Sequence, residues 1–374
     1  MHTATPSPRN HGLDTLRALA IVLVVLHHYV LFVSRADTFG WVGRIGWVGV
    51  DLFFALSGYL IGNQIFAALR SKRDFSLPRF YARRLLRTLP NFYVVLALYY
   101  LWPWFRNGAD LLPLWKFVTF TQNLNLTPGT AFSHAWSLCI EEQFYMLLPA
   151  LALLAAGLRL RLRWTWMLVG LAFVAGMAVR YALWGEYVGA AKGGYAQMGY
   201  FKYIYYSTFC RFDELVAGVA LALAKNYHPR AWRALSAHGD RALAAGAIVS
   251  ALAFWLFLQD RQGLAVTVLG FPLLALGFAL LILAALGERS VLRRTRVPGA
   301  AKLALWSYAI YLIHKQLGIL AREPLEKLGF AAESLVAIGV VMAASVLAGW
   351  ALYSVVEAPF MALRERWVPT NFRP

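Results

Sequence analysis

Hydrophobic residues occur along this chain in long continuous runs that are separated by short polar segments. An α-helix of about 20 apolar residues spans the hydrocarbon of a bilayer, and about ten runs are candidates for such a span. They cover residues 13–33, 47–69, 85–103, 142–158, 164–184, 205–224, 242–258, 264–286, 303–321 and 334–356. The pattern therefore predicts an all-α, polytopic integral membrane protein with about ten transmembrane helices.

The amino-acid composition agrees with a membrane protein. Of the 374 residues, 60% are hydrophobic and 14% are charged, whereas a soluble domain carries about 25% charged residues. The formal net charge of +18 does not indicate nucleic-acid binding, because the basic residues lie mainly in short loops, where they report topology. The first run ends without a small-residue cleavage site, so we interpret it as a retained helix. The two cysteines are far apart in sequence and suggest no disulfide framework.

Basic residues are divided unevenly between the two sets of alternating loops. One set, with both chain ends, holds 23 of the 36 Lys and Arg residues, and the other holds ten. Because positive charge marks cytoplasmic loops, we expect both termini in the cytoplasm and residues 104–141 and 185–204 outside. We find no internal repeat or long linker. Residues 1–374 are therefore predicted as one membrane-embedded domain with short cytoplasmic tails at 1–12 and 357–374 and no extra soluble domain.

The first run contains four ionisable residues, Asp14, Arg17, His27 and His28. Such residues are rare within hydrocarbon and mark functional sites. Arg17 and His28 are eleven positions apart, so they share one helix face at a separation of roughly 16 Å along the axis. His27 points about 100° away, toward a neighbouring helix. The alternative interpretation is a snorkelling arginine and a histidine that only bonds a neighbouring helix.

The second run contains Asp51, followed by Ser57 and Gly58. A carboxylate at this depth needs a partner, and the histidine pair is a candidate because a carboxylate orients an imidazole and raises its basicity. Ser57 and Gly58 favour either a close helix approach or exposure of the backbone to a ligand.

A basic cluster, Arg83, Arg84 and Arg87, lies at the start of the third run. Arg84 and Arg87 share a helix face and are suited to hold phosphate in a fork. The positive-inside rule and contact with anionic lipid headgroups explain the same cluster without a ligand.

Other ionisable residues lie at the ends of later runs. Glu141 and Glu142 lie at the start of the fourth run, where one could cap the helix and the other could reach a site. Arg211 and Asp213 are candidates for a local ion pair. His314 lies near the outer end of the ninth run, and Glu357 follows the tenth.

Seven motifs occur in an order that resembles the acyltransferase family 3 of membrane-embedded O-acyltransferases. They are LDTLRALAIVLVVLHH, GVDLFFALSGYLI, RRLLR, AWSLCIEEQFY, RFDELVAG, SYAIYLIH and VEAPF. The resemblance implies an enzyme of the cell inner (cytoplasmic) membrane that moves an acyl group, usually acetyl, from cytoplasmic acyl-CoA to a hydroxyl of an extracytoplasmic or lipid-linked carbohydrate. Some relatives acylate small molecules such as macrolides. Many carry a soluble domain after the last span, and here we expect the membrane unit alone to suffice.

The resemblance and the residue pattern together suggest a mechanism. We expect His28 to be the general base, with Asp51 or Glu141 orienting it. Arg84 and Arg87 match the paired arginines of the family. We expect the basic residues Arg17, Arg83, Arg84 and Arg87 to bind acyl-CoA. We expect the acceptor to contact Asp14, Ser57, Glu142, Arg211 and His314, and we expect no metal.

Several alternatives stay open at this level. The sequence departs from the family pattern by carrying His27 before His28, so either imidazole is a candidate for the base. A non-enzymatic, proton-coupled transporter also uses intramembrane Asp, His and Arg residues, although transporters usually show internal repeats. A subunit that only recruits a glycan-synthesis partner is the third alternative. Expected partners are acyl-CoA, a carbohydrate acceptor and membrane lipid, with no nucleic acid, and a homo-oligomer is compatible with the sequence. The acceptor, the acyl chain and the choice between direct transfer and an acyl-enzyme are not fixed by the residues.

Overall fold

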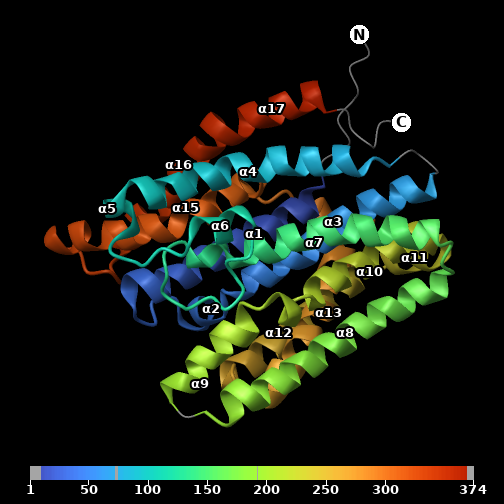
Figure 1. Cartoon of the computed structure of the whole chain (residues 1–374), viewed down its shortest axis with the longest axis horizontal. Helices are drawn as coiled ribbons and strands as arrows, with labels where there is room; N and C mark the ends of the chain where they lie inside the picture. The colour runs from blue at the N-terminus through green and yellow to red at the C-terminus, as the bar shows by residue number, and fades with distance from the viewer. Residues whose placement is uncertain (1–9, 72–74, 192, 369–374) are drawn as a thin grey trace.

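The computed structural model describes residues 10–71, 75–191 and 193–368, and these residues form helices and loops without a β-strand. This confirms the predicted all-α class (Figure 1). Residues 1–9 and 369–374 of the predicted tails lie outside the described residues.

Seven helical segments of the described chain are long and apolar enough to cross a membrane, so the protein is a multi-pass membrane protein. Their main helices are α1 (His11–Tyr29), α3 (Val48–Arg70), α7 (Trp136–Gly157), α8 (Leu162–Trp184), α12 (Gly239–Asp260), α13 (Phe271–Leu286) and α16 (Leu335–Leu352). The other three predicted runs overlap more polar or shorter helices, which are α4 (Leu77–Leu101), α10 (Asp213–Tyr227) and α15 (Ala300–Lys327). A total of ten spans stays a prediction.

Short helices and turns connect the long ones. They are η1 (Val30–Ser34), α2 (Gly40–Ile45), α5 (Pro103–Arg106), α6 (Leu114–Val118), η2 (Ser133–Ala135), η3 (Gly185–Gly189), α9 (Gly194–Gly199), η4 (Tyr200–Tyr205), η5 (Thr208–Cys210), α11 (Pro229–Ser236), η6 (Val266–Gly270), α14 (Val291–Arg294), η7 (Tyr353–Glu357) and α17 (Ala358–Trp367). The π-helix η1 follows α1 directly after the His27–His28 pair, and single π-turns of this kind are frequent at functional sites.

Helix α1 is central to the packing, because it contacts α3, α13 and α15. Helix α3 in turn packs closely on α10, and two glycines allow this. A Cβ atom at Gly58 would lie 2.1 Å from the Leu215 carbonyl oxygen, and one at Gly218 would lie 2.2 Å from the Ala55 carbonyl oxygen. Only residues without a side chain fit such a crossing. The close approach holds the middle of α3, including Ser57, in a fixed position.

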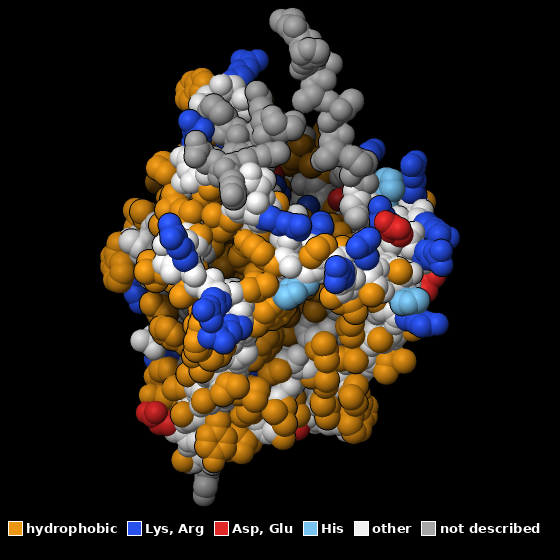
Figure 2. Space-filling model, turned by 90° about the vertical axis from the view of Figure 1, so that its right-hand side faces the viewer, with side chains coloured by type: hydrophobic (Ala, Val, Ile, Leu, Met, Phe, Trp, Pro, Cys, Tyr) orange, Lys and Arg blue, Asp and Glu red, His pale blue; other side chains and the backbone are white. Residues whose placement is uncertain are grey.

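Both ends of the described chain lie at the same end of the helix bundle, which we call the basic end. Helices α1 and α4 begin there, and α17 ends there, where Glu365 contacts Arg83 of α4. Figure 2 shows Lys and Arg side chains gathered around a hollow on this face. The shared location agrees with an even number of spans, and the side of the membrane that it faces stays a prediction.

Part of the segment 104–141, which we expect outside the membrane, is buried in the helix bundle. Its last part enters the bundle, and α7 begins at Trp136, ahead of the predicted start of the fourth run. Within this segment Phe117, Phe132, Gln122 and Asn123 are fully buried. The polar groups of Asn123 are satisfied inside the bundle, where its amide donates to Thr208 Oγ1 at 2.7 Å. The sequence pattern therefore misses a stretch of irregular backbone that is buried in the bundle.

Candidate active site

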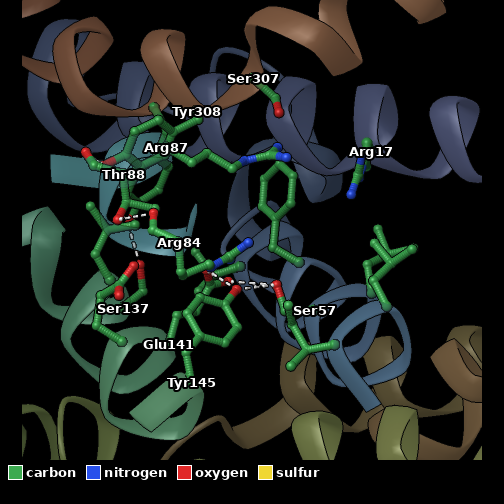
Figure 3. A pocket seen from close by; sticks show the side chains of 18 of the residues that line it. Arg17, Ser57, Arg84, Arg87, Thr88, Ser137, Glu141, Tyr145, Ser307 and Tyr308 are labelled. Carbon is green, nitrogen blue, oxygen red and sulfur yellow. Dashed lines mark hydrogen bonds between the residues drawn. The ribbon is translucent and has the colours of Figure 1, made fainter. Parts of the chain in front are cut away.

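A cavity of about 170 Å³ lies between α1, α3, α4, α7 and α15 in the half of the bundle nearer the basic end. We call it the inner cavity. Its polar lining includes six residues that the sequence singles out, which are Arg17, Ser57, Arg84, Arg87, Glu141 and Glu142. Figure 3 shows the side chains of Arg84 and Arg87 extending from α4 toward the part of the cavity that Arg17 lines. Residues far apart in sequence thus form one polar site inside an apolar bundle.

Three guanidinium groups line the inner cavity. The guanidinium carbon of Arg84 lies 3.7 Å from the centroid of the Tyr145 ring, a cation–π contact that fixes its position. Arg84 Nε has no hydrogen-bond partner within the described residues. Arg17 and Arg87 both interact electrostatically with Arg84. Three neighbouring guanidinium groups that have N–H donors without acceptors among the described residues suit an anionic ligand such as a phosphate group.

Arg83 is separate from this group. Its guanidinium donates to Glu365 Oε1 and to the Val368 carbonyl oxygen, both at 2.5 Å, so it joins α4 to the end of α17. It is not among the residues that line the inner cavity. The expected role of Arg83 in binding acyl-CoA therefore does not fit its position.

The carboxylates of the inner cavity have partners other than histidine. Glu141 Oε1 accepts a hydrogen bond from Ser57 Oγ at 3.2 Å, and Oε2 accepts one from the Tyr145 hydroxyl at 2.9 Å (Figure 3). Glu142 is buried beside Arg84 and hydrogen-bonds to Thr88. We expect Glu141 to orient His28, but the structure places its carboxylate against Ser57 and Tyr145.

Three imidazoles meet above the inner cavity, on the side away from the basic end. His28 of α1, His134 of η2 and His314 of α15 have ring centroids 4.9–6.0 Å apart. His28 Nδ1 lies 2.7 Å from His314 Nε2, and the two rings are stacked at 9°. The structure thus gives His28 an imidazole partner, whereas the sequence suggests a carboxylate.

Backbone contacts fix the proton positions of a neutral histidine pair. His314 Nδ1 lies 2.9 Å from the Ile310 carbonyl oxygen, which only accepts, so Nδ1 carries the proton. His314 Nε2 is then an acceptor, and His28 Nδ1 donates to it. This leaves the lone pair of His28 on Nε2, for which the described residues provide no partner. His28 is only partly buried, so part of its imidazole is accessible.

His134 is the functional candidate that the sequence does not identify. It is 4% exposed, and its Nε2 donates to the Leu312 carbonyl oxygen at 3.2 Å. Its Nδ1 is buried without a hydrogen-bond partner in the described part of the chain. A buried acceptor without a partner in the protein costs free energy, and such an atom often accepts a hydrogen bond from a ligand or a water molecule. In the sequence, only the motif HAW points to His134. Because residues 104–141 are expected outside the membrane, the motif does not suggest a side chain inside the bundle.

A second cavity, of about 640 Å³, lies on the other side of the three histidines. We call it the outer cavity. The same order appears on two helices. On α1, Arg17 lines the inner cavity and the π-turn residue Phe32 that follows lines the outer one, with His28 between them. On α15, Tyr311 lines the inner cavity and Lys315 lines the outer one, with His314 between them in sequence. The histidines therefore form a layer between the two cavities, and none of the three is among the residues that line them.

Asp51 lies elsewhere, in a buried ion pair. Asp51 and Arg211 are both 0% exposed, and Arg211 Nη2 donates to Asp51 Oδ1. The Arg211 guanidinium also lies 4.5 Å from the Phe271 ring centroid and 4.6 Å from that of Tyr205. The expectation that Asp51 orients His28 is therefore wrong, since its carboxylate is held by Arg211. Arg211 lines neither cavity, which argues against its expected contact with the acceptor.

The expected local pair of Arg211 with Asp213 is also wrong. Asp213 pairs with Arg180 of α8, at 2.5 Å between Oδ2 and Nη1 and at 3.0 Å between Oδ1 and Nη2. A buried arginine needs a carboxylate partner, but adjacent residues on the chain diverge to different neighbours at the start of α10. Sequence proximity alone does not identify the partner.

The remaining candidates on α1 have clear positions. His27 faces away from His28, as its position on the helix predicts, and its Nδ1 donates to the Gly43 carbonyl oxygen of α2 at 2.7 Å. Asp14 is buried and interacts electrostatically with Arg17. Glu357 accepts a hydrogen bond from the Asn91 amide at 2.8 Å and interacts with Arg87. The described residues contain no group of three or more His, Cys, Asp or Glu residues placed to hold a metal ion.

The chain is similar to known acyltransferases. A family model described as an acyltransferase domain matches residues 10–354. Peptidoglycan O-acetyltransferase OatA of Listeria monocytogenes is 29% identical over 229 residues, which cover 56% of this chain and 33% of the relative. BcsY of Komagataeibacter xylinus, provisionally named a membrane-bound transacylase, is 35% identical over 165 residues, which cover 40% of this chain and 39% of the relative. The matches thus span a third to two fifths of these relatives. No solved structure matches the chain significantly.

Proposed function

The chain belongs to the acyltransferase family 3, and from this premise we propose that it is a membrane O-acetyltransferase that uses acetyl-CoA and acetylates a hydroxyl of a carbohydrate. One observation carries the proposal: a histidine with a free nitrogen lies between a cavity lined by arginines and a second polar cavity. Acyl transfer between two bulky substrates requires both to reach one base from different directions.

The inner cavity is the proposed donor site. Coenzyme A carries several phosphates, and Arg84, Arg87 and Arg17 offer guanidinium groups that bind phosphate in a fork. Along α1, Arg17 and His28 are about 16 Å apart, which suits a long, thin donor whose thioester lies far from its phosphates. Acyl-CoA is cytoplasmic, so we propose that the basic end faces the cytoplasm and that the enzyme resides in the cytoplasmic membrane.

His28 is the proposed general base. The acceptor hydroxyl oxygen bonds to the thioester carbonyl carbon while its proton moves to His28 Nε2. The carbon–sulfur bond then breaks, and the proton passes from His28 to the departing sulfur, which leaves as the thiol of coenzyme A. His314 accepts the hydrogen bond from His28 Nδ1 and so holds the imidazole in the reactive tautomer. Transfer is direct, and no acyl-enzyme is required.

His134 is a proposed substrate-positioning residue. Its unpaired Nδ1 is an acceptor within the same histidine layer. A second hydroxyl of a sugar can donate to this nitrogen while the reacting hydroxyl faces His28. A polyhydroxylated acceptor satisfies both nitrogens at once, whereas a simple alcohol satisfies only one.

The test is acetyl transfer by the full chain in nanodiscs. We expect acetyl-CoA, but not S-acetylpantetheine, which carries the same thioester without the phosphates, to raise the unfolding temperature. We also expect transfer of labelled acetyl to an added glycan. Because the named relatives include a peptidoglycan O-acetyltransferase, soluble peptidoglycan fragments are the first acceptor to try, with a macrolide as the small-molecule alternative. A proton-coupled transporter would show neither stabilisation by acetyl-CoA nor transfer.

A further inference from the structure

The outer cavity is rich in charged and aromatic residues. Its charged lining consists of five cations and two carboxylates, which are Arg35, Arg106, Lys315, Arg322, Lys327, Glu323 and Glu326. The aromatic lining includes Trp104, which is 59% exposed. A cavity of this composition differs from the inner one, where three arginines face two glutamates.

The two carboxylates of the outer cavity are already paired with neighbours on α15. Arg322 Nε lies 2.8 Å from Glu326 Oε1, and Lys327 Nζ lies 2.6 Å from Glu323 Oε1. These four charges compensate each other within one helix. The remaining cations, Arg35, Arg106 and Lys315, make no ion pair within the residues that the structure describes. The lining of the outer cavity therefore has an excess of positive charge, since three of its five cations have no ion-pair partner within the described residues.

The backbone around the outer cavity is also unusual. Six non-glycine residues in the described chain have a positive φ angle. Three of them line this cavity: Arg35 at 54°, Asn107 at 50° and Phe132 at 55°. Non-glycine residues rarely adopt a positive φ angle. Such strained conformations cluster at functional sites, where the surrounding structure holds them in place. Segments from three separate parts of the chain thus adopt costly conformations to shape one cavity.

The cavity offers a surface suited to a sugar ring. The indole rings of Trp104 and Trp102 lie 4.9 Å apart between centroids. An exposed indole face packs against the C–H face of a sugar, while nearby polar groups bond its hydroxyls. At the inner limit of the cavity, Lys315 Nζ donates to Ser133 Oγ at 3.0 Å, next to His134 and directly after His314 in sequence. The lining of the outer cavity thus reaches residues that adjoin His134 and His314 in sequence.

We infer that the outer cavity binds the acceptor and selects an acidic carbohydrate, whose carboxylate or phosphate pairs with Arg35 and Arg106 and whose ring packs on Trp104. This inference rests on the proposed function, because it names the acceptor class of the same site. A neutral sugar would leave the excess positive charge without a partner, so charge decides between acceptors of the same shape.

The test measures binding of two matched disaccharides to the full chain in phosphatidylcholine nanodiscs by calorimetry. Cellobiuronic acid carries a carboxylate, and cellobiose is its neutral counterpart. We expect the acid to bind at least 10-fold more tightly. Arg106→Gln and Arg35→Gln should each weaken binding of the acid about 10-fold, while leaving cellobiose unaffected, because each removes a charge-assisted hydrogen bond. Glucose 6-phosphate against glucose repeats the comparison for a phosphate.

Arg44→Gln is the matched control. Arg44 lies in α2, is exposed, pairs weakly with Asp37 at 3.9 Å and does not line the outer cavity. It should leave binding of the acid unchanged. Stabilisation by acetyl-CoA, measured on each variant, should also stay unchanged, so a failure of the donor site is distinguished from a failure of this inference.

Two outcomes would overturn the inference. One is equal affinity for cellobiuronic acid and cellobiose in a protein that still binds acetyl-CoA. The other is loss of the arginine dependence when the nanodiscs contain phosphatidylglycerol, which would assign the cavity to an anionic lipid headgroup.

Discussion

The Nδ1 atom of His28 lies 2.7 Å from the Nε2 atom of His314, although 286 positions separate the two residues in sequence. The contact joins α1 to α15, and the two helices pack against each other. It gives the candidate base an imidazole as its orienting group. Because His314 is itself held by the Ile310 carbonyl oxygen, the pair directs the lone pair of His28 away from α15.

Removal of the orienting imidazole should slow turnover without affecting donor binding. In His314→Ala, His28 loses its acceptor and samples unreactive orientations. We expect kcat to fall about 10- to 100-fold while KM for acetyl-CoA changes less than about twofold. His314→Gln, whose side-chain oxygen can accept from His28, should recover part of the rate. Initial-rate kinetics on both variants give the result, and a wild-type rate in His314→Ala would contradict the role.

Donor affinity should depend on the arginines of the inner cavity. Arg84→Ala and Arg87→Ala each remove a charge-assisted bond to phosphate, which is worth about 1.5–3 kcal/mol. We therefore expect KM for acetyl-CoA to rise about 10- to 100-fold in each variant. Arg83→Ala is the matched control, because Arg83 lies one residue away but contacts Glu365 and Val368. Equal effects of Arg83→Ala and Arg84→Ala would argue that the cluster acts through general charge or folding.

The pair of Asp51 and Arg211 should act on stability. Asp51→Ala leaves a fully buried guanidinium without its carboxylate, and we expect a loss of about 3–5 kcal/mol in the free energy of unfolding. Asp37→Ala removes an exposed carboxylate that lies 3.9 Å from Arg44, and it should cost less than about 1 kcal/mol. Chemical denaturation in detergent compares the two. A stable but inactive Asp51→Ala protein would instead indicate a direct role in the reaction.

Close packing of α3 on α10 makes a prediction of its own. In Gly58→Ala the new methyl group would lie 2.1 Å from the Leu215 carbonyl oxygen, so the helices must separate. We expect a destabilisation of about 1–3 kcal/mol and a displaced Ser57 at the inner cavity. Gly170→Ala on α8 is the control, since no atom lies within 4 Å of its added Cβ. Thermal unfolding of both variants separates packing from a general effect of alanine.

Much of the helical fold follows from the sequence, because apolar runs of membrane length are a strong local signal. Each predicted run overlaps a helix, and the face shared by Arg17 and His28 follows from helical geometry. The grouping of Arg17 with Arg84 and Arg87 is also expected, since all three are predicted to bind acyl-CoA. These features depend on local periodicity or on motifs.

Partners across the bundle are harder to predict. Nothing in the local sequence indicates that Asp51 contacts Arg211 rather than a histidine. A buried carboxylate needs a basic partner, and the chain offers several buried arginines and histidines. His134 is missed for another reason. It lies in an irregular segment that enters the bundle before α7 begins, and hydropathy assigns such polar segments to the outside. Tertiary packing, which the sequence pattern does not report, determines both.

The choice between the two adjacent histidines tests the account most directly. Acetyl transfer and acetyl-CoA affinity should be measured side by side for His28→Asn and His27→Asn in nanodiscs. His28→Asn should lose about 10²- to 10⁴-fold in transfer rate while its Kd for acetyl-CoA stays within twofold of wild type. His27→Asn, which loses only a contact to Gly43, should keep a rate near wild type. A near-wild-type rate in His28→Asn would contradict the proposed base and with it the role of the histidine layer.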